Sequence, residues 1–252
     1  WYVLPDEFLV SGETLVRDLQ LGFRRAEDFG GAMEIGYLPD MFGHVAAMPQ
    51  LLALFGLEHA VVWRGVPAAI TAPAFRWRSP DGSEVRAEYL PAGYGNGSNA
   101  PEDPGELAER VSMFAAIQRG LVAEPLLWMA GMDHEVPPAH LDRVVRDLDR
   151  TDGWSVRVCS LAEHLAAAPA TDALPVHEGE LRSGARANLL MGVASNRVDV
   201  KVAAALAEQA LERHAEPLVA LWATEPQRWS SLLAVAWREV IRNAAHDSIC
   251  AC

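Results

Sequence analysis

Residues 36–44 read Gly-Tyr-Leu-Pro-Asp-Met-Phe-Gly-His, and this stretch decides our interpretation of the fold. It follows residues 33–35, which we predict to be the end of a buried strand, and it precedes a helix predicted from about residue 45 to residue 55. Loops that follow strand ends carry much of the chemistry of α/β folds. Asp40 in such a loop is ionised at neutral pH and can act as a nucleophile, a metal ligand or both. It can equally cap the following helix, which on spacing alone is the more frequent role.

Strands and helices alternate on both sides of this loop. The apolar run 1–4 is predicted as a strand, residues 14–23 carry apolar side chains at helical spacing, and residues 60–63 form a third β-rich run. Strand, helix, strand, helix, strand is the order typical of a parallel sheet with crossover helices. The sequence therefore predicts an α/β fold.

Residues 74–90 interrupt this alternation with the pattern of a β-hairpin around a Ser-Pro-Asp-Gly-Ser turn. The loop that follows, 91–104, is rich in Gly, Pro and Asn and leads into a helix predicted at 104–118. Tyr94 and Asn96 in this loop are candidate sugar contacts, because aromatic faces and amides commonly bind carbohydrates. A solvent-exposed loop is the more frequent case for such a composition.

A second carboxylate is predicted at the same edge of the sheet. The apolar residues 126–130 are typical of a buried parallel strand, and Asp133 follows them as Asp40 follows its own strand. Glycoside hydrolysis requires two such carboxylates, one as nucleophile and one as acid and base. Arg64 follows the third strand, where it either binds a carboxylate or sugar hydroxyls or lies in solvent. Asp133 can instead cap the helix predicted at 136–148.

The pattern changes in the second half of the chain. A last strand predicted at 154–159 and a short helix at 161–167 precede the Ala- and Pro-rich residues 168–175, where we place a domain boundary. Residues 198–221 and 230–245 then carry apolar side chains at helical spacing. We expect a helical bundle that packs against the first domain.

Five segments occur in an order that is found in one known family. They are Trp-Tyr-Val-Leu-Pro-Asp-Glu at 1–7, Leu-Pro-Asp-Met-Phe-Gly-His at 38–44, Val-Val-Trp-Arg-Gly at 61–65, Gly-Glu-Leu-Arg at 179–182 and His-Asp-Ser-Ile-Cys at 246–250. The chain resembles glycoside hydrolase family 38, the zinc-dependent α-mannosidases, as a bacterial-type member. The resemblance implies a partial, distorted (β/α) barrel with mostly parallel strands at residues 1–168, followed by a helical, three-helix-type middle domain at residues 176–252. Because the chain begins at Trp1 rather than at a methionine, we expect a fragment of a larger enzyme.

The resemblance also implies roles for single residues. Asp40 is implied to attack the sugar and to bind zinc, and Asp133 to be the acid and base, although some relatives have a second acidic residue where this chain has Met132. His246 follows the last predicted helix, where a histidine most often offsets the helix dipole. The resemblance implies a zinc ligand instead, and imidazole and carboxylate are compatible zinc ligands. Asp247 beside it is implied to bind the substrate or to orient the site.

Zinc is the cofactor that the resemblance implies, with one ion per active site. Asp40 and His246 would supply two ligands, and the family takes two more from a His-x-Asp segment that would precede Trp1. The one His-x-Asp of this sequence, at residues 140–142, lies in the middle of the chain rather than before Trp1, and the family's large β-rich C-terminal region has no counterpart in the sequence. We therefore expect the isolated chain to bind zinc weakly and to have little or no activity.

The implied function is retaining hydrolysis of a terminal α-linked mannose in mannoside or glycan breakdown. One alternative is a zinc-dependent deacetylase-like hydrolase, because related distorted barrels can position Asp, His and zinc for amide hydrolysis. The other is a non-catalytic carbohydrate-binding remnant that has lost the metal. The preferred linkage, and the choice between free and phosphorylated mannosides, stay open.

Composition limits the partners of the chain. Its 252 residues are 50% hydrophobic and carry a net charge of −13, so the chain can bury a large core and repels nucleic acids and anionic membranes. Its three cysteines do not form a disulfide framework, and no apolar run approaches the roughly twenty residues that cross a bilayer. We expect a cytoplasmic bacterial protein that binds a carbohydrate substrate, an α-mannoside, and no nucleic acid or membrane. Homo-oligomerisation stays open.

Overall fold

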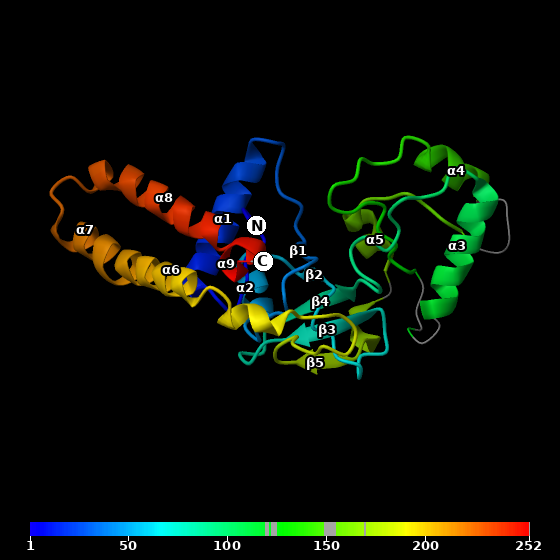
Figure 1. The fold of residues 1–252 in the computed structure, drawn as a ribbon, viewed down its shortest axis with the longest axis horizontal. Helices are drawn as coiled ribbons and strands as arrows, with labels where there is room; N and C mark the ends of the chain where they lie inside the picture. The colour runs from blue at the N-terminus through cyan, green and yellow to red at the C-terminus, as the bar shows by residue number, and fades with distance from the viewer. Residues whose placement is uncertain (119–120, 122–124, 149–154, 169, 252) are drawn as a thin grey trace. The chain divides into compact units, whose positions relative to one another are not determined.

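The computed structural model describes residues 1–118, 121, 125–148, 155–168 and 170–251 (Figure 1). The chain divides into two compact units. The sheet unit contains Glu34–Asp40 and Ala46–Ala187, and the helical unit contains Trp1–Met33, Met41–Val45 and Asn188–Cys252. In the described part of the chain, no helix combines the length and the apolar character needed to cross a bilayer.

The sheet unit is built on a mixed, mostly parallel sheet of five strands. They are β1 Gly36–Leu38, β2 His59–Val62, β3 Ala74–Arg78, β4 Glu84–Tyr89 and β5 Val176–Glu178, in the order β1-β2-β4-β3-β5. β1, β2 and β4 are parallel neighbours, whereas β3 pairs antiparallel with β4 and parallel with β5. The sheet is open over the described residues, and closure into a barrel stays a prediction.

Strand β1 begins at Gly36, after the predicted strand at 33–35, and a helix packs closely against this glycine. Helix α2, Met48–Leu54, is fully buried at Met48 and Leu52 and contacts β3 and β4. A Cβ atom at Gly36 would lie 2.8 Å from the methyl carbons of Leu52, closer than real Cβ contacts allow. Glycine therefore permits this close approach of helix and strand.

The predicted hairpin is confirmed as the antiparallel pair β3 and β4. Its turn is closed by the Ser79 N–H, which donates to the Ser83 carbonyl, and Gly82 supplies the positive φ of 90°. Three helices complete the sheet unit: α3 Pro104–Ile117, α4 Leu141–Leu148 and α5 Leu161–Ala167. Apolar side chains of α3 and α4 pack together in one buried cluster.

Three predicted strands are wrong. Residues 1–4 form no strand, and the N–H groups of Tyr2 and Val3 donate to the Asp18 carboxylate instead of to a neighbouring strand. Residues 126–130 are extended but at most half-buried and belong to no strand. Residues 155–159 also form none, and Trp154 lies outside the described residues. The runs at 1–4 and 126–130 have the composition of a strand, but side chains and loop atoms bind their main-chain groups where a sheet neighbour would.

The boundaries of the two units differ from the boundaries of the two expected domains. The expected linker at 168–175 lies inside the sheet unit, because β5 directly after it pairs with β3. The first helix of the chain, α1 Gly12–Glu27, belongs to the helical unit, although its spacing suggested a crossover helix of the sheet.

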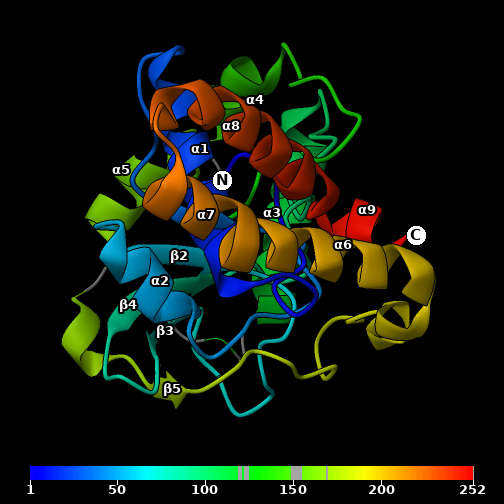
Figure 2. The same ribbon diagram turned by 90° about the vertical axis from the view of Figure 1, so that its left-hand side faces the viewer.

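The helical unit contains a long helical arm formed by α6 Val198–Ala210, a π-helical turn at Leu211–Ala215 and α7 Glu216–Trp222. Helix α8, Pro226–Asn243, runs back along this arm, and the short α9, His246–Cys250, follows it (Figures 1 and 2). A three-helix-type bundle within residues 176–252 is not confirmed. That stretch supplies two long helical segments, and α1 packs against α8 from the other end of the chain.

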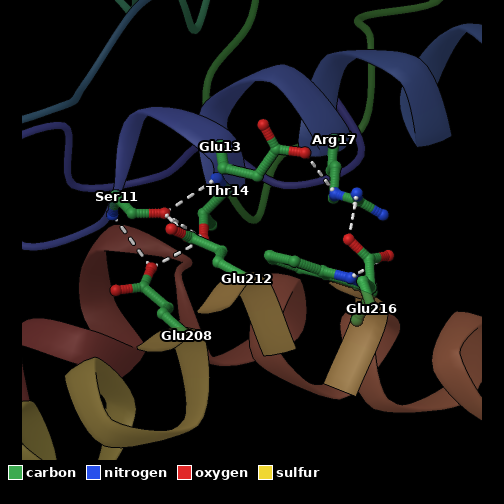
Figure 3. Close-up of polar contacts among 8 residues, drawn as sticks. Ser11, Glu13, Thr14, Arg17, Glu208, Glu212 and Glu216 are labelled. Carbon is green, nitrogen blue, oxygen red and sulfur yellow. Dashed lines mark hydrogen bonds and ion pairs between the residues drawn. The ribbon is translucent and has the colours of Figure 1, made fainter. Parts of the chain in front are cut away.

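Carboxylates of the helical arm bind the start of α1 (Figure 3). Glu208 Oε1 accepts hydrogen bonds from the Ser11 N–H at 2.9 Å and from the Thr14 hydroxyl at 2.6 Å. Ser11 is the N-cap residue of α1, and its hydroxyl also contacts Glu212. Negative charge at a helix N-terminus is favourable, so these contacts fix α1 on the arm.

A third carboxylate of the arm joins α1 to α8. Glu216 accepts a hydrogen bond from Arg17 of α1 at 2.7 Å and one from the Trp237 indole N–H of α8 at 2.9 Å. The Arg17 guanidinium also lies over the Trp237 ring, 4.2 Å from its centre. This contact among three helices explains why the first helix groups with the last ones.

Candidate active site

Asp40 and Arg64 lie at one edge of the sheet and bind each other. Each follows the carboxyl end of a strand, β1 and β2, and these strands are parallel neighbours. Arg64 Nε donates to Asp40 Oδ1 at 2.7 Å, and Arg64 Nη2 lies 2.6 Å from the same oxygen. The Arg64 and Asp40 side chains are only 13% and 20% exposed, so the attraction between their charges is weakly screened. Asp40 does not cap α2, whose N-cap residue is Ala47.

Aromatic rings lead from this pair to the loop after β4. The Arg64 guanidinium lies over the ring of Trp63, 4.1 Å from its centre. The Trp63 ring meets the Tyr94 ring edge to face, with 5.7 Å between ring centres. A Cβ atom at Gly93 would lie 3.1 Å from the Trp63 ring, so a glycine there permits the close packing of loop and ring. Tyr94 therefore lies at the same edge of the sheet as Arg64.

Tyr94 binds the second predicted carboxylate. Its hydroxyl donates a hydrogen bond to Asp133 Oδ2 at 2.9 Å. Burial raises the pKa of Tyr94 above its usual value, and the hydrogen bond to Asp133 and the negative charges of Asp40 and Asp133 raise it further. The phenol thus stays neutral and remains a donor at physiological pH. Asp133 does not cap a helix, because α4 begins only at Leu141.

Both carboxylates act on Tyr37 as well. Burial raises the pKa of Tyr37, and the charges of Asp133 and Asp40 add to that rise. Tyr37 lies in β1 and packs on the apolar cluster around Val61 and Leu90. Asp40 and Asp133 are thus linked within the sheet unit through the contacts of Arg64, Trp63 and Tyr94.

In the helical unit, His246 is held by the N-terminal segment of the chain. It is the first residue of α9, and both its main-chain N–H and its Nδ1 bind the Leu4 carbonyl oxygen, at 2.9 Å and 3.0 Å. A carbonyl accepts only a donated proton, so Nδ1 carries a hydrogen. The Phe42 ring meets the imidazole edge to face, 5.3 Å away. Asp247 is 71% exposed, and its Oδ1 lies 3.6 Å from His246 Nε2.

The donors of the chain fit zinc in kind but do not complete a zinc site. Histidine ligands of metals commonly donate their other ring nitrogen to a carbonyl, as His246 does, and a carboxylate such as that of Asp40 is a normal partner ligand. Among the described residues, however, no group of three or more His, Cys, Asp or Glu side chains is placed to hold a metal ion. Asp40 belongs to the sheet unit and His246 to the helical unit.

A buried contact between Glu7 and His44 in the helical unit escaped the sequence analysis. Glu7 Oε1 lies 2.6 Å from His44 Nδ1, both side chains are fully buried, and Glu7 Oε2 accepts the Val45 N–H at 2.8 Å. The pair fixes the segment that follows Asp40 in the chain. Glu7 lies in the segment at 1–7 and His44 in the segment at 38–44, and both segments carry the family resemblance. That position was the sequence signal that could have pointed to the two residues.

A family comparison decides the classification. The model of the glycosyl hydrolases family 38 N-terminal domain matches residues 1–180 of the chain. The chain belongs to glycoside hydrolase family 38.

Curated relatives agree with membership of family 38. The whole chain aligns with a putative mannosylglycerate hydrolase of Halalkalibacterium halodurans at 30% identity over 276 positions, which cover 30% of that relative. Shorter matches reach alpha-mannosidase G of Dictyostelium discoideum and the alpha-mannosidase of Saccharomyces cerevisiae, each at 32% identity, over 36% of the chain and 9% of the relative.

A solved structure resembles nearly the whole chain. An alpha-mannosidase from Enterococcus faecalis V583 superposes with a TM-score of 0.88 and 25% sequence identity, covering 99% of this chain and 30% of that one. This family 38 chain thus spans about a third or less of the length of the relatives it matches.

Proposed function

We propose that this chain is part of a retaining glycoside hydrolase that releases a terminal α-linked mannose through a covalent glycosyl-enzyme. The observation that carries the proposal is the pair of carboxylates at the edge of the sheet. Asp40 is held by Arg64, Asp133 is held by Tyr94, and the Trp63 ring connects the two pairs. Retaining glycosidases need two carboxyl groups with different partners, one to attack and one to transfer protons.

In the proposed reaction, an Asp40 oxygen attacks the anomeric carbon, and the bond from that carbon to the leaving oxygen breaks. Asp133 gives its proton to the leaving oxygen, which departs as an alcohol. Asp133 then takes a proton from water, the water oxygen attacks the same carbon, and Asp40 leaves as a carboxylate. Two inversions return the α configuration, so the first product is α-mannose.

The neighbouring side chains support these steps. Arg64 fixes the Asp40 carboxylate through one oxygen, and Tyr94 orients Asp133 by donating to one of its oxygens. Zinc, with Asp40 and His246 among its ligands, would act as a Lewis acid that holds the vicinal hydroxyls of the sugar. Asp247, exposed beside His246, is the proposed further substrate contact.

The substrate class rests on the relatives. One is described as a mannosylglycerate hydrolase and the others as alpha-mannosidases. These names share a mannosyl group, and the alpha-mannosidases add the α linkage that we propose. We include in the proposal a cytoplasmic location in a bacterial cell, which rests on the use of cysteine in the sequence.

The stereochemical outcome tests the proposal. We expect the complete enzyme to release α-mannose first from an aryl α-mannoside, observed by proton NMR before mutarotation. The substitution Asp40→Ala should lower kcat by on the order of 10⁴-fold or more, because it removes the nucleophile. Initial release of β-mannose would refute a retaining mechanism. Release of acetate from an N-acetylated sugar, without mannoside hydrolysis, would favour the deacetylase instead.

A further inference from the structure

The loop Gly-Tyr-Gly-Asn-Gly at 93–97 lies directly against the segment that carries Asp133. A Cβ atom at Gly95 would lie 2.9 Å from the Met132 Cβ, and one at Gly97 would lie 2.6 Å from the Met129 carbonyl oxygen. Side chains essentially never approach so closely, so only glycine allows this contact between two stretches of main chain. Both glycines flank Asn96.

The Asn96 carboxamide binds the main chain of the Asp133 segment. Its Nδ2 donates to the Leu127 carbonyl at 3.3 Å and to the Pro91 carbonyl at 2.9 Å, and its Oδ1 accepts the Met129 N–H at 2.6 Å. In an extended chain, the carbonyl of one residue and the N–H two residues later point to the same side. A neighbouring strand would bind these two groups, and here one side chain binds both.

Main-chain atoms of the loop strengthen the same junction. The Gly97 N–H donates to the Met129 carbonyl at 2.9 Å, and the Trp128 indole N–H donates to the Asn96 carbonyl at 2.7 Å. Hydrogen bonds to the loop thus hold residues 127–129, as a neighbouring strand would, although the structure assigns no strand to them. The sequence suggested sugar binding for Asn96; in the structure both Nδ2 hydrogens are donated to main-chain carbonyls, of Pro91 and Leu127.

We infer that Asn96 is a positioning residue for Asp133, which sets the hydrogen bond between Tyr94 and Asp133. Tyr94 precedes Asn96 by two residues in the loop, and Asp133 follows Met129 on the bound segment. The positions of Tyr94 and Asp133 therefore both depend on the hydrogen bonds between the loop at 93–97 and residues 127–129. The inference rests on the proposed function, because it gives Asn96 an effect on proton transfer by Asp133.

The expected signature is a dependence on the leaving group. A dinitrophenyl α-mannoside loses a good leaving group without protonation, whereas an alkyl α-mannoside needs the proton of Asp133. Displacing Asp133 should therefore slow the alkyl substrate selectively. A role in folding alone would reduce the turnover of both substrates equally, because the fraction of folded enzyme cancels in the ratio of the two rates.

The experiment compares Asn96→Ala with Asp133→Asn and with Ser98→Ala in the complete enzyme. Ser98 is the matched control, because its hydroxyl donates to the Gly95 carbonyl inside the same loop and to no atom of the 127–133 segment among its described contacts. We expect Asp133→Asn to change the ratio of dinitrophenyl to alkyl turnover by on the order of 10²–10⁴-fold. Asn96→Ala should change it about 10–100-fold in the same direction, and Ser98→Ala should leave it unchanged.

Two results would overturn the inference, and they are distinguishable. If Asp133→Asn shifts the ratio and Asn96→Ala does not, Asn96 does not position the acid. If Asp133→Asn itself leaves the ratio unchanged, the proposed role of Asp133 fails, and the role of Asn96 fails with it. Asn96→Asp is the second variant should the alanine variant not fold, because it keeps the acceptor for Met129 and removes the donor to Leu127. It should shift the ratio in the same direction.

Discussion

In the Asp40–Arg64 contact, two nitrogens of one guanidinium lie against one carboxylate oxygen. Arg64 Nε and Nη2 lie 2.7 Å and 2.6 Å from Asp40 Oδ1, and the guanidinium is stacked on Trp63. A planar guanidinium can make both contacts at once, whereas the compact ammonium of lysine cannot. Arg64 therefore fixes the direction of the carboxylate as well as compensating its charge.

Replacing Arg64 should affect catalysis and stability together. We expect Arg64→Ala to lower kcat by on the order of 100-fold and the free energy of unfolding by about 2 kcal/mol, because a mostly buried carboxylate loses its charged partner. Arg64→Lys should lie between the parent and the alanine variant. Steady-state kinetics and urea unfolding measure the two effects. Arg24→Ala is the control, since exposed Arg24 binds only the Gln20 carbonyl among its described contacts, and equal effects of Arg64→Ala and Arg24→Ala would contradict the prediction.

Asp18 in α1 should make stability depend on pH. Burial raises the pKa of this carboxyl from 3.8 to about 7, although the N–H groups of Val3 and Tyr2 donate to it and oppose the shift. Because the pKa is higher in the folded state, Asp18 adds stability that is fully present below about pH 4 and is lost as the pH rises through 7. The shift of roughly three units corresponds to about 4 kcal/mol between these limits.

Asn at this position mimics the protonated acid at every pH. We expect Asp18→Asn to resemble the parent near pH 4 and to be the more stable protein at pH 8, with urea unfolding at both pH values as the measurement. Asp28→Asn is the matched control, because Asp28 is exposed at the end of the same helix. A parent and an Asp18→Asn variant with the same pH dependence would refute a raised pKa.

Several residues of the candidate site could be predicted from the sequence, and others could not. Asp40 and Arg64 each follow a strand in the predicted parallel part of the sheet, and parallel strands bring their carboxyl ends to one edge. Tyr94 follows a strand that the sequence predicted as half of a hairpin, and only the structure shows that this strand pairs in parallel with β2. The contribution of Trp63 depends on its contacts with Arg64 and Tyr94, which no spacing rule specifies. Asn96 was interpreted as a sugar contact because it carries an amide. The amide alone does not indicate whether a sugar or the main chain binds it.

At the scale of elements, the helical arm binds the N-terminus of α1 through its carboxylates. Glu208 is buried and accepts the Ser11 N–H and the Thr14 hydroxyl. The first N–H groups of a helix have no partner within the helix; Glu208 accepts that of Ser11, and its negative charge is favourable at this end of the helix dipole. This contact stabilises α1 and its packing at the same time.

Removing that carboxylate should destabilise the helical unit. We expect Glu208→Ala to lower the free energy of unfolding by about 3 kcal/mol, because two buried donors lose a charged acceptor, and Glu208→Gln by about 1 kcal/mol, because an acceptor remains. Urea unfolding followed by circular dichroism measures both. Glu239→Ala on α8 removes an exposed carboxylate and should cost little. A Glu208→Ala variant as stable as Glu239→Ala would show that the contact contributes nothing.

Helices were easier to predict than strands for a local reason. Ser11, Asp103 and Ser160 cap α1, α3 and α5 with their own side chains, and these signals lie within one turn of each helix start. Strands depend on distant partners. Residues 126–130 have the composition of a buried strand, yet the Asn96 carboxamide takes the place of the neighbour, and only the structure reveals that substitution.

At the scale of the whole molecule, sequence order conceals which segments form each unit. In the sequence, helix α1 fits the alternation of strands and helices expected for the sheet unit. Glu216 nevertheless binds Arg17 of α1 and Trp237 of α8, which joins α1 to the last helices. The segment at 41–45 likewise joins the helical unit directly after Asp40, held by the Glu7–His44 pair. Contacts between residues so far apart in sequence leave no periodic pattern, so the discontinuous division could not be predicted.

The covalent intermediate tests the central claim most directly. A fluorosugar mannoside that forms the glycosyl-enzyme quickly and releases it slowly should label the complete enzyme, and mass spectrometry of proteolytic peptides should locate the sugar on Asp40. The account predicts one sugar per chain in the parent and in Arg24→Ala, and none in Asp40→Ala. A label on another residue, or normal labelling of Asp40→Ala, would contradict it.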